Sequence, residues 1–211
     1  MTGRLSGKVA LATGASRGIG AAIAVCLAAE GADVAISYAA SPDRAARVVG
    51  EIEAKGARGL AVSADQADPE AVAELVRTLH TQFGRLDILV HNAGVFITGT
   101  IDSPDTDVAA QARQFAINVG GVAAAVRAAA ALLPDSGRII SIGSLFGPRS
   151  PWTGIGGYSA TKSAPPSTST ADTWPERAAL SVDRNRRSVP VEPMPLGPQG
   201  AHFGSSARFG P

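Results

Sequence analysis

Tyr158 and Lys162 have the residue types and the spacing for proton transfer. Residues four apart lie on one face of an α-helix, so a phenol and an ammonium group at these positions have their polar ends close together. A phenol is a poor acid at neutral pH, and a nearby positive charge favours its ionised form, which makes it a better proton donor and acceptor. The same spacing also occurs on ordinary helix surfaces. Ser144, ahead of a loop that contains glycine and proline, favours the catalytic interpretation because its hydroxyl can donate to developing negative charge.

A glycine-rich segment from Thr13 to Gly20 has the pattern of a phosphate-binding turn. Glycines at 14, 18 and 20 allow a tight turn, a close approach to a pyrophosphate and close packing of the following helix. Free N–H groups at the start of that helix would face the anion. An apolar run precedes the segment and a helical pattern follows it, which favours a dinucleotide site over a glycine-rich turn without a ligand.

The segments that position these residues alternate between strand and helix patterns. Short apolar runs, typical of a parallel sheet buried on both faces, occupy Val9 to Ala12, Val34 to Ser37, Leu60 to Val62, Ile88 to His91 and Arg138 to Ile142. Helical patterns occupy Ile19 to Glu30, Pro42 to Lys55, Pro69 to Phe83 and Thr106 to Leu133, with Asp68 as a possible cap before Pro69. This alternation predicts an α/β fold with a doubly wound, Rossmann-like parallel sheet.

Over residues 7 to 164 the chain resembles the short-chain dehydrogenase/reductase family. The resemblance rests on the Thr13 to Gly20 turn, His91 to Gly94 after the fourth strand, Asn118, Ser144, and the segment from Tyr158 to Lys162. The turn is most similar to that of the 3-oxoacyl-thioester reductase branch. The resemblance implies an NADPH-dependent oxidoreductase that transfers a hydride between nicotinamide and a carbonyl or alcohol substrate.

The resemblance also implies roles for four catalytic residues. Tyr158 would protonate the carbonyl oxygen, and Lys162 would favour its ionised form and bind the nicotinamide ribose. Ser144 would donate a hydrogen bond to the same substrate oxygen. Asn118 would hold a water relay that leads to Lys162.

For the cofactor, the resemblance implies NADP(H) rather than NAD(H), because the second strand ends without an acid that would bind a ribose 2′-hydroxyl. Arg17, Ser37 and Ser41 would contact a 2′-phosphate, and Asp65 would contact the adenine amino group. Two alternatives to these cofactor contacts remain: Arg17 could be a solvated residue of the turn, and Asp65 could be a surface carboxylate. The expected cofactor-binding residues are Gly14, Ser16, Arg17, Gly18, Ile19, Gly20, Ser37, Tyr38, Ser41, Asp65, Asn92, Ala93, Gly94, Tyr158 and Lys162.

Other residues are expected to be structural. His91 stands where the family more commonly has Asn, and Cys26 is expected to be a buried apolar residue of the first helix. Phe146, Trp152 and Ile155 would either line a substrate pocket or pack the loop from Leu145 to Gly157.

Composition narrows the classes of function. The chain has 211 residues with 19 Lys plus Arg against 18 Asp plus Glu, a net charge of +1 that does not call for nucleic acid or an anionic membrane as a partner. One cysteine excludes an internal disulfide and favours a reducing compartment. We expect a cytoplasmic protein without structural metal, signal peptide or membrane span, acting on a small-molecule carbonyl or alcohol substrate.

The chain changes character near Ala164. Eight of the 14 prolines lie among the 47 residues from 165 to 211, where only seven residues are Leu, Ile, Val or Phe. Residues 1–164 are therefore expected to form the dinucleotide-binding domain with the catalytic residues, and 165–211 to be weakly ordered. Pro165 and Pro166 would end the helix that begins near Tyr158. The sheet would stop at about five strands, with an exposed edge.

The family normally continues with a sixth strand, a substrate-covering helix pair and a seventh strand, none of which is readable after Lys162. A frameshift near codon 164 explains the abrupt change, and a natural short variant is the alternative. The family tends to form homo-oligomers, whose interface such a change could remove. Two alternative functions follow: a nucleotide-binding but catalytically impaired remnant, or, less well supported by the glycine spacing, an extended-type epimerase or dehydratase.

Overall fold

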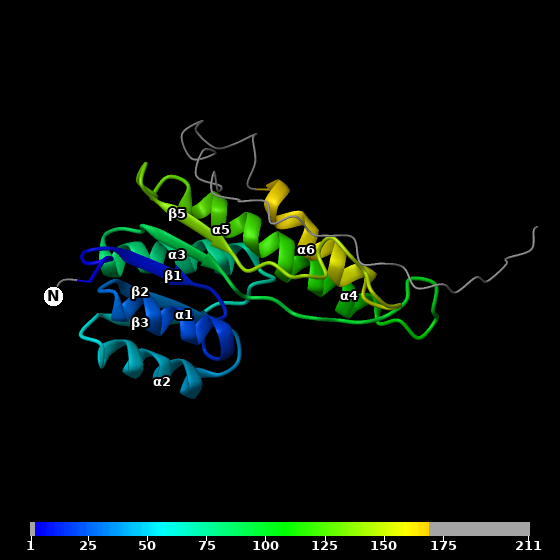
Figure 1. Ribbon diagram of the computed structural model, residues 1–211, viewed down its shortest axis with the longest axis horizontal. Coiled ribbons are helices and arrows are strands. Elements are labelled where there is room, and N and C mark those ends of the chain that lie inside the picture. The colour runs from blue at the N-terminus through cyan, green and yellow to red at the C-terminus, as the bar shows by residue number, and fades with distance from the viewer. Residues whose placement is uncertain (1–2, 169–211) are drawn as a thin grey trace, which may run out of the picture. The chain divides into compact units, whose positions relative to one another are not determined.

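The computed structural model describes the backbone of residues 3–168 and the side chains of residues 3–164. Five parallel strands form one sheet in the order β3-β2-β1-β4-β5 (Figure 1). Along the chain the elements are β1 (Val9–Ala12), α1 (Gly18–Ala29), β2 (Asp33–Tyr38), α2 (Pro42–Glu53), β3 (Gly59–Ser63), α3 (Pro69–Phe83), β4 (Ile88–His91), α4 (Val108–Phe115), the π-helix η1 (Ala116–Gly120), α5 (Gly121–Ala129), β5 (Arg138–Ser141) and α6 (Gly156–Thr168). The predicted doubly wound α/β fold is confirmed.

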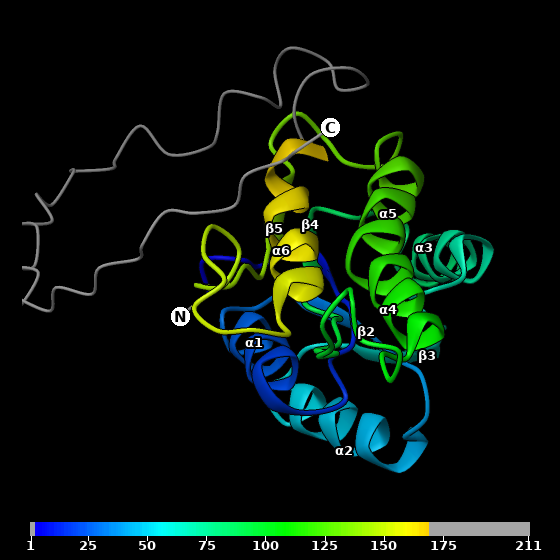
Figure 2. The ribbon, with the colours of Figure 1, turned by 90° about the vertical axis from the view of Figure 1, so that its right-hand side faces the viewer.

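Helices cover both faces of the sheet, as Figure 2 shows with α1 and α2 on one side and α3, α4 and α5 on the other. Successive side chains of β1 point to opposite faces of the sheet. Leu11 packs into a cluster with α3 and α5, and Ala12 packs into a cluster with α1 and α2. Both residues are fully buried. Burial on both faces explains why the strands are apolar runs rather than alternating patterns.

Helix α3 begins and ends where its sequence predicts. Asp68 caps it by accepting a hydrogen bond from the backbone N–H of Glu70 at 2.9 Å, and Pro69 occupies the first turn. Gly84 ends it in the left-handed conformation with φ of 77°. The cap and the helix bounds confirm the prediction for this segment.

The long helix expected from Thr106 to Leu133 is instead three pieces in one path. It starts at Val108, where Asp107 accepts from the backbone N–H of Ala110 at 2.9 Å, and the π-helix η1 joins α4 to α5. A π-turn shifts the hydrogen-bond register by one residue, which the apolar pattern of a sequence does not reveal.

Two expectations about individual residues are wrong. Helix α6 continues through Pro165 and Pro166 to Thr168, so the two prolines do not end the helix where the sequence predicts. Cys26 is exposed, since it lies two residues beyond Ala24 and so on the opposite side of α1 from the stripe of buried residues, Gly20, Ala24 and Ala28.

Strand β5 forms one edge of the sheet. Within residues 3–168 it pairs with β4 alone, and three of its four residues are exposed, with Ile140 45% accessible. Over residues 3–168 this agrees with the predicted five-stranded sheet and open edge. The expectations for the proline-rich tail lie outside the described residues, apart from the end of α6.

Candidate active site

The glycine-rich segment forms the turn between β1 and α1. Gly14 and Gly18 have φ of 61° and 59°, a conformation that residues with a side chain rarely adopt. At Gly20 a Cβ atom would lie 2.4 Å from Nδ2 of Asn92, so only glycine allows this approach of the helix to β4. The turn therefore has the shape that the sequence predicts.

Asn92 fastens this turn to the end of β4. Its Nδ2 donates to the carbonyl oxygens of Thr13 at 2.9 Å and Gly14 at 3.1 Å. The backbone N–H groups of Asn92 and Ala93 donate to Oγ1 of Thr13 at 3.2 and 3.1 Å. These bonds fix the turn against the neighbouring strand before any ligand arrives.

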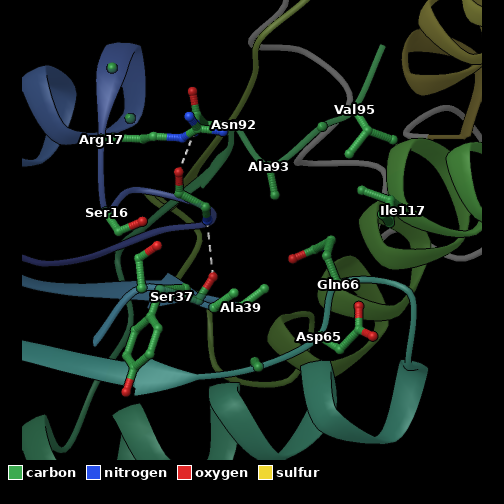
Figure 3. Close-up of a pocket in the computed structure, with 18 of the residues that line it drawn as sticks. Ser16, Arg17, Ser37, Ala39, Asp65, Gln66, Asn92, Ala93, Val95 and Ile117 are labelled. Carbon is green, nitrogen blue, oxygen red and sulfur yellow. Dashed lines mark hydrogen bonds between the residues drawn. The ribbon is translucent and has the colours of Figure 1, made fainter. Parts of the chain in front are cut away.

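A cleft of about 730 Å³ opens over the carboxyl ends of the strands. Figure 3 shows Arg17, Ser16 and Asn92 on one side of it and Asp65, Gln66 and Ile117 on another. All the predicted cofactor residues except Tyr158 and Lys162 line this cleft. Sequence reasoning missed these lining residues: Ala39, Ala40, Arg44, Ala64, Gln66, Val95, Arg113 and Ile117. The ends of parallel strands in such sheets are where ligands bind.

The end of the cleft beside β2 is cationic. Arg17 and Arg44 both line it, and neither forms an ion pair within the part of the chain that the structure describes. Oγ of Ser37 accepts from the backbone N–H of Gly14 at 3.0 Å, which leaves its own hydroxyl hydrogen for another acceptor. The basic residue three positions after Ser41, in the first turn of α2, is the signal that would have identified Arg44.

Asp65 lies beyond the end of β3 and is held from two sides. Its carboxylate accepts from the backbone N–H of Ala67 at 2.9 Å and from Nη2 of Arg113 at 2.9 and 3.1 Å. These two partners, Ala67 first, hold the pKa of the Asp65 carboxyl below its usual range. Arg113 comes from α4, 48 residues along the chain, so no local sequence signal links the pair.

Asn118 lies in the π-helix η1, a type of turn often found at functional sites. The side chain is buried, and its Oδ1 accepts from the backbone N–H of Val95 at 2.9 Å. Its Nδ2 donates to the carbonyl oxygen of Val95 at 3.0 Å and to Oγ1 of Thr161 at 2.9 Å. Asn118 thus joins the segment that follows β4 to helix α6.

Tyr158 and Lys162 lie one turn apart on α6, as their spacing predicts. Nζ of Lys162 is 5.9 Å from the centre of the Tyr158 ring and donates to the carbonyl oxygen of Ile142 at 3.1 Å. The Tyr158 ring also meets Phe96 edge-on, with ring centroids 4.7 Å apart. Burial lowers the pKa of the Lys162 ammonium.

Gly94 is the point at which two of the predicted catalytic residues approach the cleft. A Cβ atom there would lie 3.3 Å from Oδ1 of Asn118 and 3.5 Å from Nζ of Lys162. Gly94 itself lines the cleft. The structure therefore brings Asn118 and Lys162 to the rim of the cleft, although neither lines it.

Ser144 follows β5 in a loop that rests on α6. Its Oγ accepts from the backbone N–H of Phe146 at 3.1 Å. Oγ of Ser163 on α6 donates to the carbonyl oxygen of Gly147 in the same loop at 2.5 Å. The loop that carries Ser144 is thus fixed against the helix that carries Tyr158 and Lys162.

Two roles were predicted for the apolar residues of the loop from Leu145 to Gly157, namely lining a substrate pocket or packing the loop, and the structure shows a different role for different residues. Ile155 is fully buried and packs the loop. Phe146 and Trp152 form an edge-to-face pair with centroids 4.9 Å apart, and the Trp152 side chain is 52% accessible. The pair, rather than Ile155, is available to a ligand.

His91 is buried at the end of β4, and neither ring nitrogen has a hydrogen-bond partner among the described residues. Burial lowers the pKa of His91 to about 4. The ring is therefore neutral at pH 7.

Within residues 3–168, no group of three or more His, Cys, Asp or Glu side chains is placed to hold a metal ion. No helix of that part of the chain is long and apolar enough to cross a membrane.

A family model for short chain dehydrogenases matches residues 8–171. The chain belongs to the short-chain dehydrogenase family. It is 44% identical over 142 residues to an uncharacterised oxidoreductase of Methylorubrum extorquens, a match that covers 67% of this chain and 56% of that protein. Over 88 residues it is 51% identical to a 3-oxoacyl-(acyl-carrier-protein) reductase of Staphylococcus epidermidis, covering 42% of this chain and 36% of that one.

Among solved structures, a short chain dehydrogenase from Burkholderia cenocepacia in complex with NADP is similar with a TM-score of 0.74 and 50% identity. The match covers 76% of this chain and 65% of that one. The chain therefore spans less than two thirds of the length of each of these three proteins.

Proposed function

We propose that the chain binds NADPH in the cleft and uses it to reduce a carbonyl group, or NADP to oxidise the corresponding alcohol. The observation that carries this proposal is the position of Gly94, which lines the cleft and is approached by Asn118 and Lys162. A nucleotide site and a proton-transfer group thus share one boundary. The Burkholderia neighbour that contains NADP supports the same type of cofactor.

The residues present fit this cofactor. The glycine turn leaves room for a pyrophosphate beside the first turn of α1, because Gly18 has no Cβ and no other atom lies within 4 Å of the place where one would be. Arg17 and Arg44, which form no ion pair with any residue from 3 to 168, supply two cations for a 2′-phosphate, and the end of β2 carries no acid that would repel it. These features favour NADP(H) over NAD(H).

When bound, NADPH supplies the hydride, and the chain's own residues handle the proton. The hydroxyl of Tyr158 donates to the substrate oxygen, and the ammonium of Lys162 on the same helix stabilises the phenolate that remains. The hydroxyl of Ser144 donates a hydrogen bond to the same oxygen. Asn118 holds the end of β4 against α6 and so positions Lys162.

For the substrate we propose a 3-oxoacyl thioester, whose ketone is separated from the thioester carbonyl by one methylene, in line with the similarity to the 3-oxoacyl reductase. The exposed Trp152 and its partner Phe146 offer an apolar surface after Ser144 for such a chain.

The experiment has two arms on the full chain. The first measures NADPH binding from the change in nicotinamide fluorescence, and the second measures NADPH oxidation at 340 nm with an acetoacetyl thioester and with a simple diketone. Binding with turnover supports the proposal. Binding without turnover selects the alternative, a nucleotide-binding chain without catalysis, and absence of binding contradicts both.

A further inference from the structure

The ion pair between Asp65 and Arg113 crosses one end of the cleft. Asp65 comes from the loop after β3 and Arg113 from the last turn of α4, and both line the cleft. Nη2 of Arg113 lies 3.1 Å from Oδ1 and 2.9 Å from Oδ2 of the carboxylate. One guanidinium nitrogen therefore holds both oxygens, and together with the N–H of Ala67 it fixes the plane of the carboxylate.

The hydrogen bonds leave the carboxylate with one open acceptor position. A carboxylate has about four, two on each oxygen. On Oδ1 they are taken by the N–H of Ala67 at 2.9 Å and by Arg113. On Oδ2 only Arg113 is bound, so the remaining lone pair belongs to that oxygen.

We infer that Arg113 is a positioning residue that presents this single lone pair of Asp65 to the exocyclic amino group of adenine. The inference rests on the proposed binding of NADPH in this cleft. An amino group is a donor and suits the free acceptor, whereas the carbonyl oxygen of hypoxanthine at the same ring position is an acceptor and repels it. The pair therefore selects adenine over hypoxanthine.

The Asp65 carboxylate depends on Arg113 for this orientation. Ala67 binds only one oxygen, which leaves the plane of the carboxylate free to turn about that contact. Both side chains are about half accessible, 55% for Arg113 and 44% for Asp65, so water would take the place of the guanidinium if it were removed. Loss of Arg113 would then change the direction of the lone pair while the charge of Asp65 remains.

The test compares the binding of NADPH and of its hypoxanthine analogue, deamino-NADPH, by nicotinamide fluorescence, which needs no turnover. The wild-type chain is expected to prefer NADPH by about tenfold, the size of one charge-assisted hydrogen bond at an accessible site. Arg113→Gln should reduce this preference to about twofold or less by weakening NADPH binding alone. Arg113→Lys, which keeps the charge, should restore part of it.

Two controls separate the possible outcomes. Asp65→Asn should lose the preference as well, and Arg127→Gln, an exposed arginine of α5 outside the cleft, should retain it. If Arg113→Gln keeps the wild-type preference, or loses the folded state as judged by circular dichroism, the inference is overturned and only the proposed function stands. If the wild-type chain binds neither nucleotide, the proposed function and the inference both fail.

Discussion

Asn118 donates a hydrogen bond from Nδ2 to Oγ1 of Thr161, 2.9 Å away, and Thr161 in turn donates to the carbonyl oxygen of Tyr158 at 2.7 Å. Both side chains are buried. Two predicted catalytic residues, 40 positions apart in the chain, are therefore connected through one hydroxyl group. Thr161 lies between Tyr158 and Lys162 on α6, yet it faces the π-turn rather than the cleft.

Thr161→Val should lower the free energy of unfolding by about 1–3 kcal/mol, because it removes an acceptor from a buried amide without changing the side-chain shape. Urea unfolding measures the effect. Thr161→Ser keeps the hydroxyl and should lose less than half as much. Equal losses in the two variants would show that packing of the methyl group, and not the bond to Asn118, is responsible.

Tyr158→Phe should reduce NADPH-dependent carbonyl reduction by at least about 100-fold and leave the Kd for NADPH within about twofold. The ring and its edge-on contact with Phe96 remain in this variant, so only the transferable proton is lost. Steady-state kinetics and fluorescence titration measure the two quantities. Turnover at the wild-type rate would remove Tyr158 from the mechanism.

Arg17→Gln should weaken NADPH binding by about tenfold and NADH binding by less than about twofold, because the lost charge faces only the additional phosphate. Arg44→Gln should act in the same direction, since Arg44 lines the same end of the cleft. Arg77→Gln, an arginine paired with Glu70 and Glu74 on α3, is the control and should change neither Kd. Equal losses for both nucleotides would make Arg17 a residue of the turn structure.

Acidification should destabilise the fold through His91. Its pKa is about 4 in the folded chain against 6.5 for the free side chain, so between these values the unfolded chain binds the proton and the folded one does not. Stability is then complete above about pH 6.5 and falls by about 3 kcal/mol as the pH approaches 4.

Urea unfolding at pH 7 and at pH 4.5 measures this effect as the difference between the wild-type chain and His91→Asn, which should lose less stability over the interval. His80→Gln removes an exposed histidine of α3 and should behave as the wild-type chain does. If His91→Asn loses as much stability between pH 7 and pH 4.5 as the wild-type chain does, groups other than His91 cause the effect.

Asp87→Asn should lower the free energy of unfolding by about 2 kcal/mol. The buried carboxylate accepts from both ends of the Arg85 guanidinium at 2.7 Å, from Lys8 at 3.2 Å and from the backbone N–H of Val9 at 3.0 Å. Burial alone raises the pKa of Asp87, and these bonds, Arg85 first, outweigh it and hold the pKa below its usual range. Glu74→Gln, at an exposed ion pair, should change the unfolding free energy by less than about 0.5 kcal/mol.

The strands could be predicted to within one residue at each end. For the central strands the reason is burial on both faces, which makes them apolar runs, as in β4, predicted and observed at Ile88–His91. The break at Ala116–Gly120 could not, because a change of hydrogen-bond register leaves the apolar pattern of α4 and α5 intact. The exposure of Cys26 was missed for a related reason. Helix α1 is apolar on all sides, so its sequence does not show which side faces the sheet.

In the candidate site, too, some features could be predicted from local sequence patterns and others could not. The glycine turn and the Tyr158 and Lys162 pair are local patterns, and their spacing alone predicts their placement. Arg113 reaches Asp65 from 48 residues away, and a contact of that kind depends on how α4 lies over the sheet. Arg44 could have been predicted from a local signal, because it is a basic residue soon after the second strand. The prediction did not use that signal.

The order of the site along the chain has a consequence for synthesis on the ribosome. Every residue that lines the cleft lies between Gly14 and Ile117, whereas Ser144, Tyr158 and Lys162 come later. Translation at about 5–20 residues per second leaves several seconds between the emergence of Ile117 and that of Lys162. Under the proposed function, the residues that bind the nucleotide therefore leave the ribosome several seconds before the groups that would use it.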